Sequence, residues 1–435
     1  MSTHPVSKPS AKKPTVVLVL QGGGALGAYH IGAYQALAEH GLHPNWVCGI
    51  SSGAINAAVI AGNLPEERSA QLHGLWQSIS RPDVVPIAFP QWRWLYNMAS
   101  NASALLFGQP NFFTPRPINP FLVLRAAPPL VSFYDTTPMR STLQSFANFE
   151  LINSKATRLS LGATNIATGE LEFFDNADQL ITPEHVLASG SLPPGFAATQ
   201  IGRELYWDGG CVSNTPLDAV IDAPHHPHLV VFMIDLWNAT GAAPHNMYEV
   251  LWRAKQIQYA SRTAHYIDAV ATKVNLRHAL GLLKAAGAAA VAAAPDNFEA
   301  RRVDIVHVIY SPGPNQFPNS DAEFSRASLA ERSACGYRDL QAAIAAQPWL
   351  QDLPPHLGAL VHRVQEQRVT TLPEPNLHSM SDAANGAVQK EPILGESNAD
   401  GTAMVNDKPH SPIPRQARVR RRPRPAQTPT PSKPE

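Results

Sequence analysis

The chain has 435 residues, of which 44% are hydrophobic, and its 34 Lys and Arg residues balance 34 Asp and Glu residues. This composition supports a sizeable core, and the lack of any apolar run of about 18 residues excludes an evident membrane-spanning helix. The three cysteines are an odd number without metal-binding spacing, so structural disulfides and a metal site are not expected. No cofactor is expected either.

The chain begins with a polar segment. Residues Met1–Pro14 are rich in Lys and Pro and lack the apolar centre of a signal peptide, so we expect a disordered tail and no export by that route. Thr15–Leu20 is a short β-branched and apolar run that ends at glycines, which predicts a buried strand. The glycine-rich residues Gln21–Gly27 follow, and Ala28–Glu39 has the apolar spacing of a helix.

The glycines of this turn allow three interpretations. Gly22, Gly24 and Gly27 form a G-x-G-x-x-G pattern, which is typical of dinucleotide-binding loops. Such a loop requires an acidic residue about 20 positions further on to hold the ribose, and here the next strand ends at Cys48 without one. A purely structural turn is the second interpretation. We favour the third, an oxyanion hole in which the N–H groups of Gly22, Gly23 and Gly24 face a negatively charged oxygen.

Ser51 lies at the centre of a nucleophile-elbow pattern. Trp46–Cys48 reads as a short strand, Gly49-Ile50-Ser51-Ser52-Gly53 matches G-x-S-x-G, and Ala54–Ala61 reads as a helix of small residues. Strand, sharp turn and helix are the context that this motif requires. The two glycines of the motif relieve crowding in the turn, and the first N–H groups of the helix point at the reaction site. The pattern predicts that Ser51 is a nucleophile.

The middle of the chain has less specific features. Val84–Tyr134 is rich in aromatic residues and proline, so it could wall an acyl pocket, form a cap at a lipid interface, or supply ordinary core. Arg158–Asn176 reads as a hairpin. Leu205–Trp207 leads into Asp208-Gly209-Gly210, which on its own indicates only a common Asp-Gly turn.

Together, the glycine loop, the elbow and Asp208-Gly209-Gly210 resemble the patatin-like phospholipase family, whose members have these motifs in this order. The resemblance covers about residues 15–221. Within it, Ala188-Ser189-Gly190-Ser191-Leu192-Pro193-Pro194 is similar to the family's segment ahead of the aspartate. Residues 97–116 and 321–339 are similar to a bacterial subgroup with an extra C-terminal segment. Leu26 stands where many members have Arg or Lys, so any role of that positive charge is in doubt here.

The resemblance implies an α/β protein with a three-layer α/β/α fold, a mostly parallel central sheet, a helical C-terminal extension and disordered tails. It also implies hydrolysis of lipid acyl esters by a serine–aspartate dyad. Ser51 attacks the carbonyl, Asp208 takes the proton as general base, and the glycine loop stabilises the oxyanion of an acyl-enzyme pathway. Supporting positions of the motifs are Gly27, Gly49, Gly53, Gly209 and Gly210.

Three alternatives remain open. A classical α/β-hydrolase would add a histidine after Asp208, for which His245, His265 and His307 are the candidates, but that fold places several strands ahead of its nucleophile. A non-catalytic scaffold that binds lipid surfaces is the second alternative. A hydrolase of another ester, such as a storage polyester, is the third. The histidines nearest the motifs, His30, His40 and His43, are more simply surface or turn residues than catalysts.

We expect a tail over 1–14, a catalytic domain over 15–221, an extension over 222–365 that packs on it, and a Pro-rich disordered tail over 366–435. Leu229–Leu236 reads as a buried strand. The long apolar stripe of Asn246–Leu283 predicts a helix that either covers the core or faces lipid.

The last predicted segment contains a basic run. Arg415–Arg424 holds six arginines and no acid, so it could contact an anionic membrane, bind nucleic acid without specificity, or act only as a spacer. No specific nucleic-acid partner is expected. The expected partner is the acyl-ester substrate, and the expected location is the cytoplasm, with a peripheral position at the inner membrane as one option.

Overall fold

The computed structural model describes residues 14–81, 90–123, 125–221, 228–288, 301–313 and 316–372. All of them belong to one compact unit, Met1–Leu377. The second unit, His378–Glu435, lies outside the described residues, and so does the predicted basic run Arg415–Arg424.

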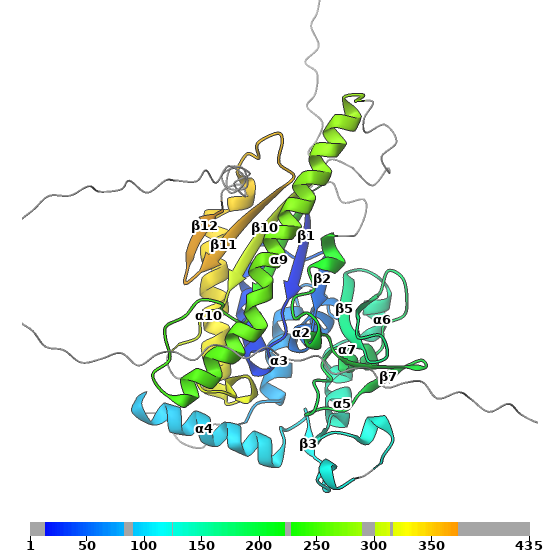
Figure 1. Ribbon diagram of the computed structural model, residues 1–435, viewed down its shortest axis with the longest axis vertical. Coiled ribbons are helices and arrows are strands. Elements are labelled where there is room, and N and C mark those ends of the chain that lie inside the picture. Colours follow the sequence, from blue (N-terminus) through cyan, green and yellow to red (C-terminus); the bar gives the residue numbers. More distant parts are fainter. Residues whose placement is uncertain are drawn as a thin grey trace, which may run out of the picture. The chain divides into compact units, whose positions relative to one another are not determined.

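A ten-stranded sheet lies at the centre of the molecule (Figure 1). Its strand order is β12-β11-β10-β9-β1-β2-β5-β8-β7, with β6 also paired to β5. The six strands from β11 to β5 in this order run parallel to one another, and the remaining strands pair antiparallel. The strands are β1 (Thr15–Leu20), β2 (Trp46–Gly49), β5 (Arg158–Asn165), β6 (Leu171–Asp175), β7 (Thr199–Ile201), β8 (Glu204–Asp208), β9 (His228–Asp235), β10 (Arg302–Ile309), β11 (Ala359–Gln365) and β12 (Arg368–Thr371), while β3 (Thr114–Pro115) and β4 (Tyr134–Asp135) form a separate pair.

The first strand shows why the sheet has a core on both faces. Leu18 and Leu20 belong to one hydrophobic cluster, and Val17 and Val19, which alternate with them, belong to another. Side chains of successive strand residues point to opposite faces, so a strand buried on both sides must be apolar throughout. The predicted strand Thr15–Leu20 is therefore confirmed, and its pattern reflects a sheet covered on both faces.

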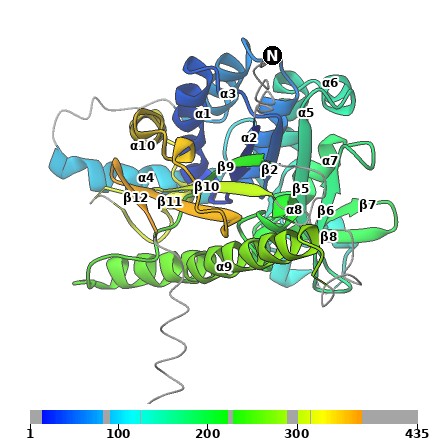
Figure 2. The ribbon, with the colours of Figure 1, turned by 90° about the horizontal axis from the view of Figure 1, so that it is seen from above.

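Helices cover the two faces of this sheet, which confirms the three-layer α/β/α fold (Figure 2). Helices α1, α2, α3 and α10 lie on one face, and α8 and α9 lie on the other. The helices are α1 (Tyr29–Glu39), α2 (Ser52–Ala61), α3 (Arg68–Ser78), α4 (Pro90–Phe107), α5 (Thr137–Phe146), α6 (Phe149–Asn153), α7 (Pro183–Ser189), α8 (Asp218–Ile221), α9 (Met247–Ala285) and α10 (Arg326–Ala346). Short 3₁₀ turns occur at η1 (Gly24–Ala28), η2 (Pro120–Leu122), η3 (Pro128–Leu130), η4 (Gly209–Cys211), η6 (Ser320–Ala322) and η7 (Pro348–Leu350).

The C-terminal part of the chain is not only helical. It contributes β9, β10, β11 and β12 to the central sheet, so the sheet is continuous across residue 221. The ordered chain also continues past the expected boundary at 365, because β12 pairs with β11 through Arg368–Thr371. Strand β9 confirms the predicted buried strand Leu229–Leu236, whereas β10 and β11 escaped the sequence analysis because they carry charged and histidine side chains within their apolar pattern.

Helix α9 covers the sheet with one side. Ile267, Val270 and Val274 are buried in the same cluster as the strand residues Val17 and Val19. This position confirms the interpretation as a core-covering helix over the middle of α9. None of the described helices combines the length and the apolar character needed to cross a membrane.

Candidate active site

The predicted elbow is formed, and Ser51 is at its apex. Ser51 lies between β2 and α2 with φ 56° and ψ −124°, a left-handed region that costs energy for any residue with a Cβ. A Cβ at Gly49 would overlap the carbonyl oxygen of Gly53, and a Cβ at Gly53 would overlap the carbonyl oxygen of Leu20. Only glycine fits at both positions, so the motif's glycines are required by the close approach of three backbone segments.

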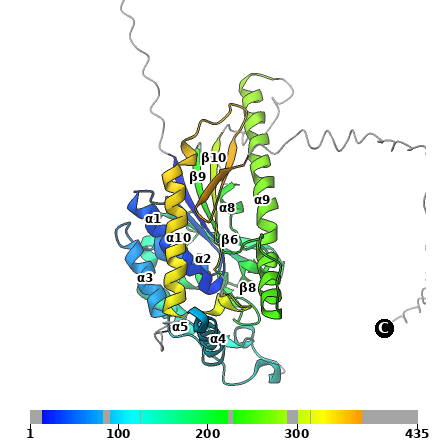
Figure 3. The same ribbon diagram turned by 90° about the vertical axis from the view of Figure 1, so that its left-hand side faces the viewer.

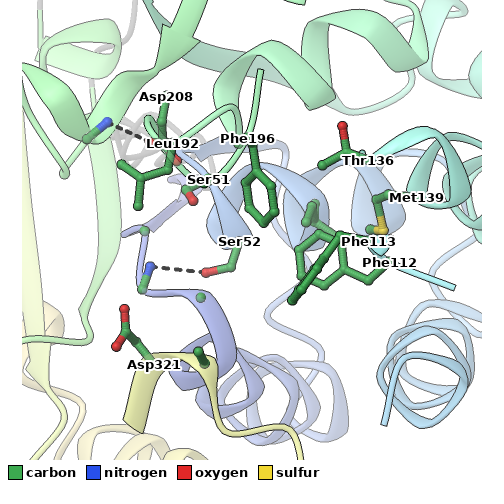
Figure 4. A pocket seen from close by; sticks show the side chains of 18 of the residues that line it. Ser51, Ser52, Phe112, Phe113, Thr136, Met139, Leu192, Phe196, Asp208 and Asp321 are labelled. Carbon is green, nitrogen blue, oxygen red and sulfur yellow. Dashed lines mark hydrogen bonds between the residues drawn. The ribbon is translucent and has the colours of Figure 1, made fainter. Parts of the chain in front are cut away.

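Strand β5 brings Asp208 to Ser51. In the sheet, Gly49 at the end of β2 pairs with Leu161 of β5, and Asp208 at the end of β8 pairs with Ala163 of the same strand. The ends of β2 and β8 are thus two residues apart along β5. Figure 4 shows the side chains of Ser51 and Asp208 in one cavity, which both residues line.

Asp208 is buried, and its two carboxylate oxygens differ in their hydrogen bonding. Its side chain is 1% exposed, and its Oδ1 accepts a hydrogen bond of 2.7 Å from the N–H of Gly210. Its Oδ2 has no partner with hydrogen-bond geometry among the described residues. Burial raises the pKa of Asp208 to about 7, and this effect is partly opposed by the Gly210 N–H and by the nearby Ser51 hydroxyl, both of which favour the charged form. A carboxyl group with this pKa is suited to take a proton near neutral pH.

The glycine loop lies against the elbow. A Cβ at Gly22 would be 3.0 Å from the Cβ of Ser51, and the N–H of Gly23 donates to Ser52 Oγ at 3.1 Å (Figure 4). The N–H of Gly22 donates to the carbonyl of Asn214 at 3.3 Å. Two of the three predicted oxyanion donors are therefore bonded to protein groups in this conformation. Gly24 has φ +54°, a value that favours glycine.

The remaining motif glycines also lie at close approaches. A Cβ at Gly27 would be 2.7 Å from Ser52 Oγ, and one at Gly209 would be 2.7 Å from the carbonyl oxygen of Gly162. At Gly210 the nearest atom would be Asn214 Oδ1, at 3.0 Å. Each of these glycines thus permits contact between the loops that carry the candidate site.

Sequence reasoning missed the residues that hold these loops together. Asn214 donates through Nδ2 to the carbonyl of Gly22 at 2.7 Å, and Trp237 donates through Nε1 to the same oxygen at 2.9 Å. Gln21 is fully buried, donating to Thr215 Oγ1 at 2.9 Å and accepting from the N–H of Leu236 at 2.7 Å. A buried glutamine next to the glycines was a signal, but its partners lie about 200 positions away and no local pattern indicates them.

Ser189 supports the elbow from the segment that resembles the family. The N–H of Ser51 donates to the carbonyl oxygen and to the Oγ of Ser189, both at 3.1 Å. Two residues further on, the carbonyl of Ser191 accepts from the N–H of Asp208 at 3.0 Å. One short segment therefore fixes the backbone of both predicted catalytic residues.

A mostly apolar cavity of about 300 Å³ opens beside Ser51. Residues from the aromatic segment line the cavity on one side of Ser51. Asp321, from the C-terminal part of the chain, lines it on a different side of Ser51 (Figure 4). Asp321 is paired with Lys255 Nζ at 2.6 Å. The apolar wall includes Leu105, Phe112, Phe113, Tyr134, Met139, Val186, Leu192, Phe196 and Phe324.

The histidine candidates lie elsewhere. None of the described residues that line the cavity is a histidine. His307 pairs with Asp235 at 2.7 Å, His245 is exposed, and the side chain of His265 lies outside the described residues. His30 was expected at the surface or in a turn and is instead fully buried within α1, because α1 is covered by its neighbours, and Asn56 Nδ2 lies 3.1 Å from its Nδ1. Among the described residues, no group of three or more His, Cys, Asp or Glu is arranged to hold a metal ion.

Comparison with protein families identifies two matched regions. Residues 18–221 match the patatin-like phospholipases, and residues 257–356 match a second family described as patatin phospholipase. The first match ends shortly after the Asp208-Gly209-Gly210 motif, and the second begins within α9.

Individual relatives match over short stretches. Triacylglycerol lipase ptl3 of Schizosaccharomyces pombe is 47% identical over 55 residues, which are 13% of this chain and 11% of that lipase. Triacylglycerol lipase SDP1L of Arabidopsis thaliana is 36% identical over 62 residues, which are 14% of this chain and 8% of that lipase. The chain thus matches about a tenth of the length of these relatives.

Among solved structures, VipD from Legionella pneumophila is similar over 75% of this chain and 67% of its own, with 15% identity and a TM-score of 0.30. Human GIVD cytosolic phospholipase A2 is similar over 50% of this chain and 42% of its own, with 10% identity and a TM-score of 0.28.

Proposed function

Because the chain belongs to the patatin-like phospholipase family, we propose that it is a serine hydrolase of lipid acyl esters that uses Ser51 and Asp208 as a catalytic dyad. One observation carries the proposal: Asp208, whose pKa burial raises to about 7, shares a cavity with a serine at the apex of a strained elbow. A nucleophilic hydroxyl needs a base beside it, and a base works best when its pKa is close to the working pH.

The proposed reaction has two halves. Ser51 Oγ attacks the ester carbonyl as Asp208 Oδ2 takes its proton, and the proton then passes to the departing alcohol. A water molecule attacks the acyl-enzyme with Asp208 again as base, which releases the fatty acid and restores Ser51. The developing oxyanion faces the glycine loop, where the Gly24 N–H is the candidate donor not already paired with Asn214 or Ser52.

The shape of the cavity supports an acyl substrate. Phe112, Phe113 and Phe196 lie within contact distance of one another, with ring centroids 5.2 to 5.9 Å apart. Aromatic and aliphatic walls of this kind favour a hydrocarbon chain over a polar group. We place the acyl chain along this wall and the leaving group on the side of Asp321.

Two finer expectations belong to this proposal. One is a cytoplasmic location at the periphery of the inner membrane, and the other is a contact of Arg415–Arg424 with anionic lipid, for which that run supplies charge. A storage polyester stays an alternative substrate, since its ester carbonyl would meet the same groups.

Labelling with a fluorophosphonate probe tests the proposal against the scaffold alternative. Wild-type protein should be labelled at Ser51, and Ser51→Ala should be unlabelled and inactive on a p-nitrophenyl ester. Loss of a covalent nucleophile typically costs several orders of magnitude in turnover. Wild-type protein that neither takes the label nor releases p-nitrophenol, while remaining folded, would identify a non-catalytic scaffold.

A further inference from the structure

The segment from the last turn of α4 to β4 exposes many large apolar side chains. Phe121 is 81% exposed, Leu122 is 77% exposed and Phe107 is 72% exposed. We refer to this set as the apolar rim. It consists of Leu105, Leu106, Phe107, Ile118, Phe121, Leu122, Val123, Leu130 and Val131. A contiguous stretch of such residues on a protein surface marks a site of interaction.

The apolar rim is continuous with the mouth of the cavity beside Ser51. Leu105 belongs to both, since it lines the cavity and is 39% exposed, and its carbonyl accepts a hydrogen bond of 2.7 Å from the Tyr134 hydroxyl. At the other end of the rim, the N–H of Tyr134 donates to the carbonyl of Gly195 at 2.9 Å, and Gly195 also lines the cavity. The rim is therefore pinned to the cavity wall.

The loop that carries most of the rim has a defined fold. Arg116 donates through Nε to Ser132 Oγ and through Nη2 to the carbonyl of Pro129, both at 3.0 Å, while β3 pairs with β4. The 3₁₀ turns η2 and η3 lie between these strands and carry Phe121, Leu122 and Leu130. Figure 1 shows β3 and α4 at the same end of the molecule, and Figures 1 and 3 show α4 away from the C-terminal end of α9. Apolar residues are thus held outward on a folded loop.

The charged residues of this segment are all positive. Between Asp83 and Asp135 the sequence contains no aspartate or glutamate, although the whole chain has 34. The charged residues in that interval are Arg93, Arg116 and Arg125, and Arg125 is exposed. A surface that combines exposed apolar groups with positive charge is complementary to an anionic lipid surface.

We propose that the apolar rim inserts into the surface of an anionic lipid bilayer and places the mouth of the cavity at the level of the acyl chains. A substrate chain then passes from the bilayer along Leu105 into the apolar end of the cavity without crossing water. The choice of lipid as the partner rests on the proposed function, but membrane binding itself is measured without turnover.

Co-sedimentation of the full-length protein with vesicles tests the proposal. Phe121→Ser/Leu122→Ser should bind vesicles of equal parts phosphatidylcholine and phosphatidylglycerol about tenfold more weakly than wild type or worse, because two exposed apolar side chains no longer enter the bilayer. Arg125→Glu should weaken binding to these vesicles and leave binding to pure phosphatidylcholine unchanged. Melting temperature and turnover of a soluble p-nitrophenyl ester should stay at wild-type values in both variants.

The matched control is Leu282→Ser/Leu283→Ser, which replaces two adjacent exposed leucines at the C-terminal end of α9, away from the apolar rim (Figure 1). It should bind vesicles as wild type does. Unchanged binding by the rim variant, or an equal loss in the control, would overturn the proposal and leave the rim as a surface for another protein. If no ester is hydrolysed but vesicle binding depends on Phe121 and Leu122, the proposed function fails and the membrane contact stands.

Discussion

The guanidinium of Arg332 in α10 donates a hydrogen bond of 3.0 Å to the carbonyl of Ala25 in the glycine loop, across 307 positions of sequence. Arg332 also donates to the carbonyls of Glu323 and Ser320, at 2.8 and 2.9 Å, and is 3% exposed. It therefore ties the loop to the turn η6, whose Asp321 carbonyl lies where a Cβ on Gly24 would be. The C-terminal part of the chain thus holds the predicted oxyanion loop in place.

We predict that Arg332→Met lowers kcat with little change in KM and reduces stability. Arg332 contacts the loop and not the cavity, so it is a positioning residue, and its loss lets the Gly24 region move. Removing one member of a buried charged cluster typically costs about 3–5 kcal/mol, here because Glu323 would remain buried without its cation. Steady-state kinetics on a soluble ester and thermal denaturation measure the two effects.

Arg332→Lys and Arg338→Met serve as comparisons for this prediction. Lysine keeps the positive charge, but its ammonium group cannot donate to all three carbonyls as the planar guanidinium of Arg332 does. The kcat and the melting temperature of Arg332→Lys should therefore lie between those of wild type and Arg332→Met. Arg338 is exposed on the same helix, and its removal should leave kcat unchanged. A purely structural role for Arg332 would lower the melting temperature without lowering kcat in the folded variant.

The dyad predicts non-additive mutations. Asp208→Asn should lose nearly as much activity as Ser51→Ala, and the double variant should be no worse than either alone, because both groups act in one proton transfer. Single-turnover kinetics on an activated ester gives the comparison. High activity in Asp208→Asn together with inactivity in His307→Ala would instead point to a triad.

The pH dependence of turnover follows from the environment of Asp208. Burial raises its pKa to about 7, and a general base works only when it is ionised. The value of kcat/KM should therefore rise about tenfold per pH unit below about pH 7 and level off above it. A profile that is already flat at pH 5 would show that Asp208 does not titrate as the essential base.

The same pKa predicts how stability depends on pH. The folded protein holds the Asp208 proton more tightly than the unfolded chain, since the pKa rises from 3.8 to about 7 on folding. The free energy of unfolding should then fall as pH rises through this window and stay lower above it. Asp208→Asn removes this cost, so at pH 8 it should be more stable than wild type by up to about 4 kcal/mol, and near pH 4 the two should be similar. Urea denaturation at both pH values provides the measurement.

Substitution by alanine should affect the stability of the protein differently at two glycines near the site. Gly53→Ala should be severely destabilising, because its Cβ would overlap the carbonyl oxygen of Leu20 in the adjacent strand. Gly190→Ala should be tolerated, because the nearest atoms to its Cβ would be 3.8 Å away and its φ is −105°. Melting temperatures of the two variants decide the matter. A Gly53→Ala variant as stable as Gly190→Ala would mean that the elbow can rearrange around a side chain.

Local sequence patterns were sufficient for several elements. The strand Thr15–Leu20, the turn and helix around Ser51, and the hairpin from Arg158 to Asn176 were each predicted and are each formed. These features depend on apolar spacing and on glycines at a crowded turn, which act over a few residues. A sequence carries such short-range information directly.

Other features needed the tertiary structure. The aromatic segment Val84–Tyr134 had three possible roles, and only the structure shows that its described residues differ in environment: Phe112 and Phe113 line the cavity, while Phe107 and Phe121 are exposed. His30 was expected at the surface because a lone histidine gives no sign of what covers it. Burial depends on neighbours contributed by other parts of the chain, and no local window contains them.

The sequence by itself determined the elbow at Ser51 and the glycine turns on either side of it, because each is a local backbone geometry that only certain residues permit. It did not determine why Asp208 meets Ser51, or what supports the glycine loop. Those relationships exist because the ends of β2 and β8 pair with β5 at positions two residues apart, and because α10 brings Arg332 to Ala25. Strand pairing and helix packing join residues far apart in sequence, so only the folded chain brings them together.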